Sequence, residues 1–247
     1  MGSFVTVAGP RTAGAAGGRA DIVVPVYNEE ACVDEFYARM QRLGLSDSLI
    51  FVDNASTDRT VERIQRFPDV RLVRHQTNEG YGASIRHGIA SSDAEFIIII
   101  DADLEYPPET IRPVLSALED HAAVHASRFL GQRPEMSLLR RLGNRLITAT
   151  YNVLFRQHIT DLCTGLKGLR RDAFALAALR KNGFEHAMEL AALIALSGEQ
   201  IYEVPVHYSP RVRGRSKMRH LREASKFLVY LTTYWFRGVV LRRPLSL

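Results

Sequence analysis

The sequence predicts an α/β fold with a mostly parallel central sheet and helices on both of its faces. Short apolar runs rich in Val and Ile alternate with helical patterns through the first half of the chain. One run, 96–100, has no polar alternation, which is typical of a central strand buried on both faces. At 247 residues and 46% hydrophobic, the chain can bury one substantial core.

Each element can be placed in order along the chain. In the first half, strands are expected at 22–26, 49–52, 70–73 and 96–100, and helices at 30–43, 57–67 and 81–90. In the second half, the less regular pattern predicts a strand at 122–126, an amphipathic stretch at 138–155, a short segment near 164–169, helices at 171–179 and 187–196, and a strand at 200–207. No internal repeat or low-complexity linker supports a second domain.

The two ends of the chain are expected to differ from the domain between them. Residues 1–20 are rich in Gly and Ala and lack the pattern of a signal peptide, so they predict a flexible leader. Residues 21–217 are expected to form the domain, and 218–247 a basic, amphipathic C-terminal helix. Its apolar run contains Arg237 and, at about 15 residues, is shorter than the roughly 20 needed to span a bilayer. It predicts either a helix lying on a membrane or one packed on the domain or a partner subunit.

Positive charge is concentrated near the C-terminus. The formal net charge is +5, yet residues 211–247 alone hold ten basic residues and one acidic residue. This asymmetry predicts an anionic partner. A phosphate ligand or an anionic membrane fits better than nucleic acid, because no nucleic-acid module is recognisable and no aromatic residues interleave with the first part of the basic run.

Cysteines and histidines give no sign of a metal site in the sequence. Cys32 and Cys163 have no partners at metal-ligand spacing, and they predict neither a disulfide framework nor a zinc site. A reducing compartment fits this usage. The eight histidines, His75, His87 and His121 among them, show no i, i+4 metal pairing and are expected to have structural or surface roles.

Three acidic side chains follow the buried strand directly. Asp101, Asp103 and Glu105 stand at alternate positions, with Ala102 between the two aspartates. Alternate residues of an extended chain point the same way, so these carboxylates are expected to converge on a hard divalent cation such as Mg²⁺ or Mn²⁺. A metal-diphosphate site is the natural use of such a group. An isolated Asp-x-Asp is more often a solvated turn or helix cap, but here it follows an apolar strand.

Other polar loops are expected at the same edge of the sheet, where ligands of such folds bind. The segment Pro25-Val-Tyr27-Asn-Glu29 ends the first strand, and Asp53 ends the second. A Tyr or Pro can flank a flat base, and Asp53 can accept hydrogen bonds from its N–H groups or from ribose hydroxyls. Either loop alone could be a helix cap. Gly80, at the start of the third helix, permits close approach of the backbone to a ligand.

Together these motifs resemble the family 2 glycosyltransferases of GT-A fold, and more closely the dolichyl- or polyprenyl-phosphate sugar synthases. The resemblance extends from about residue 21 to about residue 217. Its closer branch depends on later residues: Ser127-Arg128, Arg140, Asp161, Thr164-Gly-Leu-Lys167, Glu189, Val204-Pro205 and Arg211-Val-Arg213-Gly-Arg-Ser216-Lys217. Asn54, where many relatives have a second Asp, and Glu105, where mannosyl synthases often have Gln, depart from the pattern and leave the sugar and the base open.

The resemblance implies a role for each motif. Asp101, Asp103 and Glu105 would organise the metal, and the loop from Arg211 to Lys217 would close over the phosphates. The positions expected to bind the donor, GDP-mannose or a UDP-hexose, are Pro25, Tyr27, Glu29, Asp53, Gly80, Asp101, Ala102, Arg211, Arg213 and Lys217. The catalytic candidates are Asp103, Arg128, Arg140, Asp161 and Glu189.

The nature of the acceptor can also be argued from the residues. A sugar hydroxyl must lose a proton as it attacks and requires a base, for which Asp161 and Glu189 are candidates, although either could instead hold an arginine in place. A lipid phosphate is already anionic and requires cations, which Arg128, Arg140 and the 211–217 loop could supply. We therefore expect an inverting displacement at the anomeric carbon, with a polyprenyl phosphate attacking and a nucleoside diphosphate leaving.

Three alternatives remain open. The chain could transfer sugar to a hydroxyl of a soluble acceptor, act as a nucleotidyltransferase that releases pyrophosphate, or serve as a non-enzymatic binding subunit. The expected setting is the cytoplasmic face of a membrane, where the C-terminal helix would contact anionic lipid or a small membrane-anchoring partner. Nucleic acid is not an expected partner.

Overall fold

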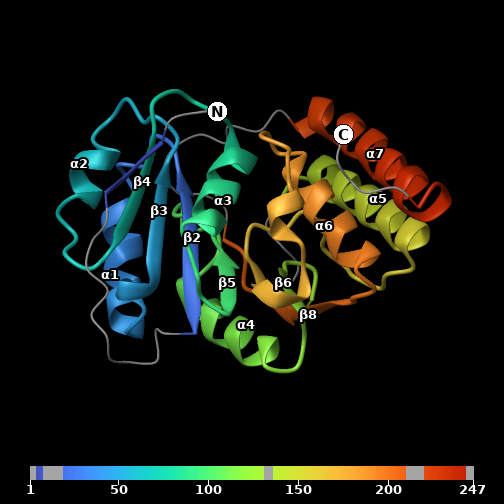
Figure 1. Ribbon diagram of the computed structural model, residues 1–247, viewed down its shortest axis with the longest axis horizontal. Helices are drawn as coiled ribbons and strands as arrows, with labels where there is room; N and C mark the ends of the chain where they lie inside the picture. Colours follow the sequence, from blue (N-terminus) through green and yellow to red (C-terminus); the bar gives the residue numbers. More distant parts are fainter. Residues whose placement is uncertain (1–3, 8–18, 131–135, 210–219, 243–247) are drawn as a thin grey trace.

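An eight-stranded mixed sheet runs through the protein, with helices on both faces (Figure 1). The structure, a computed structural model, describes residues 4–7, 19–130, 136–209 and 220–242. The spatial order of the strands is β1-β4-β3-β2-β5-β7-β6-β8. Their bounds are β1 Phe4–Val7, β2 Ala20–Val26, β3 Leu49–Asp53, β4 Arg71–His75, β5 Phe96–Ile99, β6 Ala123–Ser127, β7 Lys167–Arg170 and β8 Ile201–Pro205.

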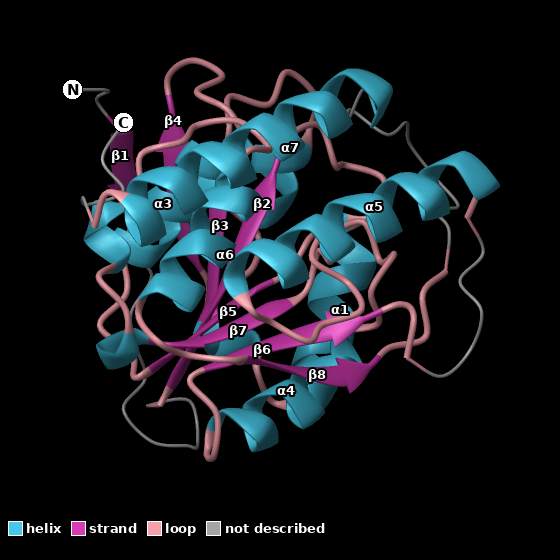
Figure 2. Ribbon diagram, turned by 90° about the vertical axis from the view of Figure 1, so that its right-hand side faces the viewer, coloured by secondary structure: helices cyan, strands magenta, loops and turns pink. Residues whose placement is uncertain are grey.

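Two layers of helices cover the sheet (Figure 2). The helices are α1 Val33–Leu43, α2 Thr60–Ile64, α3 Tyr81–Ala90, α4 Ile111–Leu118, α5 Leu138–Phe155, α6 His186–Leu196 and α7 His220–Trp235, which continues as a π-helix over Phe236–Val240. Along β5, Ile97 and Ile99 pack with α3, α5, α6 and α7, whereas Phe96 and Ile98 pack with α1 and α4. This alternation explains the unbroken apolar run of β5, because each of its faces meets a layer of helices.

The direction of the strands decides which residues meet. β4, β3, β2 and β5 are parallel, so their carboxyl ends share one edge of the sheet. β7 runs antiparallel between β5 and β6, and Ile99 pairs with Lys167. The amino end of β7 therefore lies at that same edge, beside the carboxyl ends of β5 and β6. The fold class expected from the sequence is confirmed.

Two expectations about the helices and the leader are wrong. The 171–179 segment forms two short 3₁₀ turns instead of a helix, because the Arg171 side chain donates to the carbonyl oxygens of Ile89, Ser92 and Ala94 and fixes the chain against the start of β5. Phe4–Val7, expected in a flexible leader, is strand β1, paired antiparallel with β4. Its alternating Val residues suit an added edge strand.

α4 is a helix that was not predicted from the sequence. It has eight residues and includes Pro113. Proline is tolerated there because the first turn of a helix has no intrahelical partner for the missing N–H. Ile111, Val114 and Leu118 form its buried face, packed against the sheet.

The C-terminal helix packs on the domain. Phe227, Leu231 and Tyr234 of α7 are buried in the same cluster as residues of α5 and α6. This agrees with one of the two interpretations of the apolar C-terminal run, while Val229 and Phe236 on another face of the helix stay exposed. Within the described ranges, no helix combines the length and the apolar character that crossing a membrane requires.

Candidate functional site

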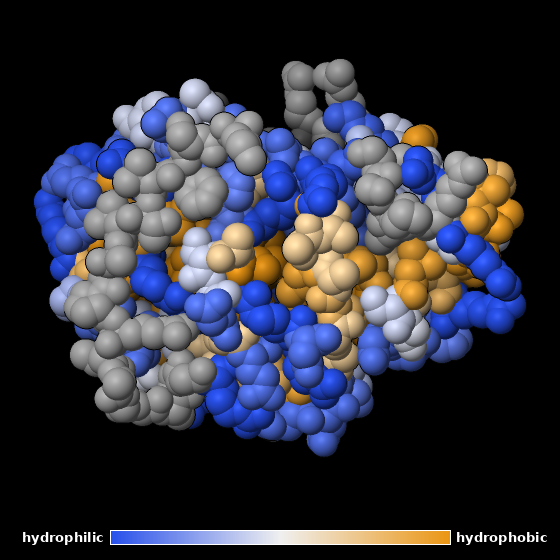
Figure 3. Space-filling model, in the orientation of Figure 1, coloured by the Kyte–Doolittle hydropathy of each residue, from blue (hydrophilic) through white to orange (hydrophobic). Residues whose placement is uncertain are grey.

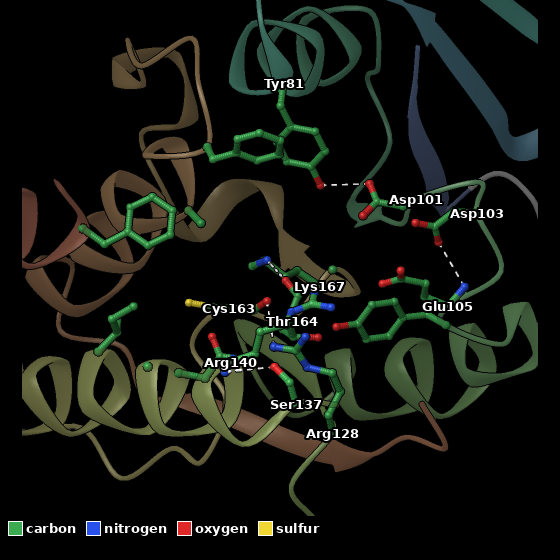
Figure 4. A pocket seen from close by; sticks show the side chains of 18 of the residues that line it. Tyr81, Asp101, Asp103, Glu105, Arg128, Ser137, Arg140, Cys163, Thr164 and Lys167 are labelled. Carbon is green, nitrogen blue, oxygen red and sulfur yellow. Dashed lines mark hydrogen bonds between the residues drawn. The ribbon is translucent and has the colours of Figure 1, made fainter. Parts of the chain in front are cut away.

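A cavity of about 800 Å³ opens at the edge of the sheet where the parallel strands end. Pro25 near the end of β2, Asp101 after β5, Arg128 after β6 and Lys167 at the start of β7 all line it. Residues of α5, the N-terminal part of α6 and Phe227 of α7 form the opposite wall. Figure 4 shows the acidic and basic side chains approaching this space from different elements.

A smaller cavity of about 270 Å³ adjoins the first. Pro25, Tyr81 and Phe184 line both, so the two spaces are neighbouring compartments. Of the residues expected to bind the donor, Tyr27 and Gly80 line only the smaller cavity. Its size and its Tyr and Pro walls suit a flat ring better than a phosphate.

The three acidic residues after β5 reach the large cavity through a turn. Asp101, Asp103 and Glu105 all line it, as the sequence predicts. The chain is not extended there, however: Leu104 has φ 63°, a left-handed conformation that is strained for a leucine. The expectation that alternate positions of an extended chain point these carboxylates the same way is therefore wrong, because the chain makes a tight turn between them.

These carboxylates do not form a complete ion cage by themselves. In the part of the chain that the structure describes, they are not a group whose ligand atoms come together. Tyr81 donates a hydrogen bond to Asp101 Oδ1 (3.1 Å), and Tyr208 donates one to Glu105 Oε2 (3.1 Å). A small divalent cation typically keeps one or two carboxylates and takes its other ligands from phosphate and water. The site fits a Mg²⁺ or Mn²⁺ ion that a diphosphate helps to hold.

The electrostatics of the pair Asp101 and Asp103 favour a cation. Burial, and then the negative charge of Asp103, raise the pKa of Asp101 to about 7. Two adjacent carboxylates in a buried place resist ionising together, and a divalent cation relieves that repulsion. The residues present therefore fit the metal expected from the sequence.

We expect Mn²⁺ to raise the melting temperature more at about pH 8 than at about pH 5.5, because a proton competes with the cation for Asp101 below its raised pKa. Without metal, the same raised pKa makes stability fall as the pH rises from the ordinary Asp range toward 7, since the unfolded chain ionises first. Thermal unfolding with and without Mn²⁺ at the two pH values measures both effects. Asp101→Asn should abolish the pH difference. A Mn²⁺ shift of equal size at both pH values would contradict the prediction.

Arg128 is held in the cavity wall by a buried ion pair. Its Nε and Nη2 donate to the two carboxylate oxygens of Asp161 (2.7 and 2.8 Å), and Nη2 also donates to the carbonyl of Cys163 (3.0 Å). Among the described residues, these bonds use Nε and Nη2, so Nη1 remains for a ligand. Tyr106 and Tyr208 flank the guanidinium, with ring centroids 6.0 and 5.5 Å from its carbon. The group is a positioned cation that can bind a phosphate.

The same pairing bears on the role of Asp161. Burial by itself would raise its pKa, but the charge and hydrogen bonds of Arg128 outweigh burial and hold the pKa below the ordinary value. Asp161 is not among the residues that line the cavity. Its geometry thus favours the alternative of holding an arginine over that of a general base.

Two further cations face the cavity. Arg140, in the first turn of α5, lines it, and its backbone N–H donates to the Ser137 hydroxyl that caps the helix. Lys167 is buried, and its ammonium donates to the Thr164 carbonyl. Burial lowers the pKa of Lys167, while the charges of nearby groups, Asp101 among them, oppose that effect. Carboxylates therefore lie at one end of the cavity, and cations lie beside them.

Comparison with protein-family models identifies the family of this chain. The model for glycosyl transferase family 2 matches residues 21–176. The chain belongs to glycosyl transferase family 2. The resemblance noted in the sequence is thereby confirmed, and the matched range contains the acidic turn, Arg128, Arg140 and Asp161.

Curated relatives include two dolichol-phosphate mannosyltransferases and an undecaprenyl-phosphate sugar transferase. A dolichol-phosphate mannosyltransferase of Pyrococcus furiosus is 26% identical over 212 residues, which cover 81% of this chain and 59% of the relative. One of Saccharomyces cerevisiae is 26% identical over 217 residues, covering 80% of each chain. An undecaprenyl-phosphate 4-deoxy-4-formamido-L-arabinose transferase of Salmonella paratyphi B is 28% identical over 214 residues, covering 83% of this chain and 64% of the relative. The chain thus spans less than two thirds of the Pyrococcus and Salmonella proteins.

Solved structures confirm the GT-A fold of this family 2 member. The glucosyl-3-phosphoglycerate synthase of Mycobacterium tuberculosis in complex with Mg²⁺ and UDP superposes with a TM-score of 0.66 and 19% identity, covering 90% of this chain and 79% of that one. The same enzyme with Mn²⁺, UDP and phosphoglyceric acid gives a TM-score of 0.65, also at 19% identity, covering 90% and 78%. At this identity the likeness shows the fold alone.

The donor-side loops of this family 2 chain are built around Asp53, Asn54 and Gly80. Asp53 is buried, its Oδ1 accepts from the backbone N–H of Ser56, and its Oδ2 has no partner among the described residues. Asp53 lines neither cavity, so its contact with the nucleotide stays a prediction. Gly80 (φ 100°) lies against the backbone of Asn182, which a Cβ would strike at 2.3 Å. The close approach that this glycine permits is thus to the protein's own backbone.

Glu189 is a predicted site residue that lies apart from the cavities. Its carboxylate accepts the backbone N–H groups of Arg180 and Lys181 (2.9–3.0 Å). Its position favours support of that loop over the role of a base or an arginine partner. Pro25 and Glu29 line the large cavity, as does Ala102. Arg211, Arg213 and Lys217 lie outside the described residues.

Several residues in or beside the large cavity were given no role from the sequence. Tyr81, Tyr106 and Tyr208 surround the carboxylates and Arg128, and Lys167 reaches the cavity from β7. Lys167 carried a signal, because a lysine is unusual in an otherwise apolar buried strand. The tyrosines carried none, since aromatic residues beside strands are ordinarily core residues.

Proposed function

We propose that this protein transfers a hexose from a nucleotide-sugar donor to a polyprenyl phosphate, with inversion at the anomeric carbon. The observation that carries the proposal is the composition of the large cavity. One cavity holds the metal-fitting carboxylates Asp101 and Asp103, the cations Arg128 and Arg140, and an apolar wall from α5. The carboxylates with their cation would suit a diphosphate, the two arginines would suit a second phosphate, and the apolar wall would suit a hydrocarbon chain.

The apolar wall is open to solvent along α5. Leu139, Leu142 and Leu146 line the cavity and are nevertheless 60%, 62% and 58% exposed, and Leu138 beside them is 64% exposed. Figure 3 shows hydrophobic side chains gathered at the end of the molecule where α5 and α7 lie. Exposed apolar residues grouped in this way mark an interaction surface. A polyprenyl chain beside its phosphate explains why apolar wall and cations share one cavity.

Charge on the same helix supports a membrane setting. α5 carries Arg140, Arg141 and Arg145 and no acidic residue. Leucines interleaved with arginines suit a helix that rests on an anionic membrane. The same surface would bring the mouth of the cavity to the lipid phosphate, without requiring a membrane-anchoring partner.

The chain's own residues would each have a part in the displacement. Arg128 and Arg140 bind and orient the acceptor phosphate, whose anionic oxygen attacks the anomeric carbon without a general base. Asp161 keeps Arg128 in place, and Tyr81 orients Asp101. Asp101 and Asp103 would hold a Mg²⁺ or Mn²⁺ ion, which would supply positive charge to neutralise the leaving nucleoside diphosphate. Pro25 and Tyr27 would flank the base, and Asp53 would accept from the base or the ribose.

A panel of donors and acceptors tests the proposal. The purified protein is incubated with Mn²⁺ or Mg²⁺ and labelled GDP-mannose, UDP-glucose or UDP-GlcNAc, with and without a polyprenyl phosphate. Label should enter the organic phase with one donor and only when the lipid phosphate is present, which would also identify the sugar. Transfer to a soluble acceptor, or donor cleavage that ignores the lipid, would favour the soluble-acceptor alternative instead.

Replacing the leucines of the cavity wall should impair use of the lipid. In Leu139→Ser/Leu142→Ser/Leu146→Ser, loss of apolar contact is expected to raise the KM for polyprenyl phosphate by roughly tenfold or more. Donor binding should change little, because these residues lie away from the carboxylates. Val153→Ser is the matched control: Val153 is 80% exposed on the same helix but does not line the cavity. Equal KM values in the triple variant and the control would refute the assignment of the wall.

A further inference from the structure

A cluster of potential metal ligands lies outside the large cavity. His75 ends β4, Glu79 lies in the following loop, and His87 stands on α3. One ligand atom from each comes within 4.8 Å of the others. Within the described residues, these three are the group of His, Cys, Asp or Glu side chains whose potential ligand atoms already lie this close together. The carboxylates of the acidic turn do not form such a group. The cluster is partly open, since His75 is buried while Glu79 and His87 are half-buried.

Hydrogen bonds determine which nitrogen of His75 carries a proton. Asn78 Oδ1 accepts from the backbone N–H of Gly80, so the Asn54 amide nitrogen must be the donor to it (3.0 Å). Asn54 Oδ1 is then an acceptor, which also receives the N–H of Glu79 (2.8 Å). The His75 Nδ1 that lies 3.0 Å from this oxygen must donate. His75 Nε2 therefore carries a lone pair.

That lone pair faces the second histidine. His75 Nε2 lies 2.8 Å from His87 Nδ1, and the two rings are nearly perpendicular, with an interplanar angle of 82°. Without metal, a proton on His87 Nδ1 bridges the two nitrogens. A metal ion would replace this proton after a small separation of the rings, because two imidazoles on one zinc ion stand roughly 3.3 Å apart. Asn54 would act as the partner that fixes the tautomer and orientation of a ligating histidine.

We propose that His75, Glu79 and His87 form a second metal site, for a borderline transition-metal ion of the Zn²⁺ type. Two imidazoles and one carboxylate are a usual donor set for zinc and a poor one for Mg²⁺, which prefers oxygen ligands. Bound metal would tie the end of β4 to α3. Through Asn54, which lines the smaller cavity, it would also stiffen that cavity's wall.

Zinc binding by the untagged full-length chain tests the site. After removal of metals with a chelator, the protein is titrated with Zn²⁺ against a chromogenic chelator, with excess Mg²⁺ present to occupy the oxygen-rich site. One equivalent should bind tightly and raise the melting temperature. His87→Ala and Glu79→Gln should each weaken binding by roughly tenfold or more, and circular dichroism checks that both variants fold.

Two control variants make the outcome specific. His158→Ala removes an exposed histidine elsewhere and should leave zinc affinity unchanged. Asp103→Asn should also leave it unchanged, which separates this site from the acidic turn and from the proposed transfer reaction. Absence of stoichiometric zinc binding, or equal affinity in wild type, His87→Ala and Glu79→Gln, would overturn the proposal and leave an ordinary hydrogen-bonded histidine pair.

Discussion

Asp103→Asn is expected to reduce sugar transfer about a thousandfold, which corresponds to about 4 kcal/mol of lost transition-state stabilisation. Asp103 is buried in the cavity wall beside Asp101. Its Oδ1 accepts the backbone N–H of Glu105 (3.0 Å), a hydrogen bond that an asparagine oxygen can keep. The substitution therefore removes the charge that would hold the cation and preserves the turn. Initial rates with the donor that the panel identifies, over a range of Mn²⁺ concentrations, measure the loss.

Asp172→Asn is the matched control for this substitution. Asp172 is an exposed aspartate in a 3₁₀ turn, paired with Arg170 at the surface. The transfer activity of the Asp172→Asn variant should stay within about twofold of wild type, because exposed ion pairs contribute little to stability. Transfer by Asp103→Asn at a rate close to wild type, with an unchanged dependence on Mn²⁺, would remove the metal from the proposed mechanism.

Much of this site could be predicted because its residues stand in local patterns. An apolar strand followed by Asp101 and Asp103 is visible in sequence, since the sheet must end where polar residues begin. The bounds of α5 agree with the predicted amphipathic stretch 138–155, because its buried face recurs at helical spacing. Both of these patterns are formed by residues that lie close together in the sequence.

The remaining features depend on contacts between distant segments. The antiparallel direction of β7, which brings Lys167 to the cavity, is set by its pairing with β5 and β6. The 171–179 segment has helix-forming residues, yet Arg171 is bound to carbonyls some 80 positions earlier. Local propensity is overridden in such cases. The sequence left Asp161 either as a base or as the partner of an arginine, and only the structure shows that it is paired with Arg128.

The pairing of Asp161 with Arg128 leads to the largest expected change in stability. Asp161→Asn should lower the free energy of unfolding by about 3 to 5 kcal/mol, because it leaves a buried guanidinium without its counter-charge. Arg128 and Asp161 are both almost fully buried, and the carboxylate also accepts the backbone N–H of Arg128 (3.1 Å). Urea denaturation of both proteins measures the difference.

The pH dependence of this loss has a definite sign. The pKa of Asp161 is held below its ordinary value in the folded protein, so the pair stabilises the fold above the aspartate range of the unfolded chain. The difference between wild type and Asp161→Asn should be complete at neutral pH. It should shrink as the pH falls through the lowered pKa, where the wild-type carboxylate is protonated too.

A double variant separates stability from function. In Arg128→Met/Asp161→Leu both charges are gone, so most of the lost stability should return, because well-packed apolar residues can replace a buried pair. Transfer to polyprenyl phosphate should stay low, since the phosphate has lost its positioned cation. If transfer returned together with stability, Arg128 would be a structural residue only. If Asp161→Asn alone unfolded no more easily than Asp172→Asn, the ion pair would not hold the cavity wall, and the orientation of Arg128 would need another cause.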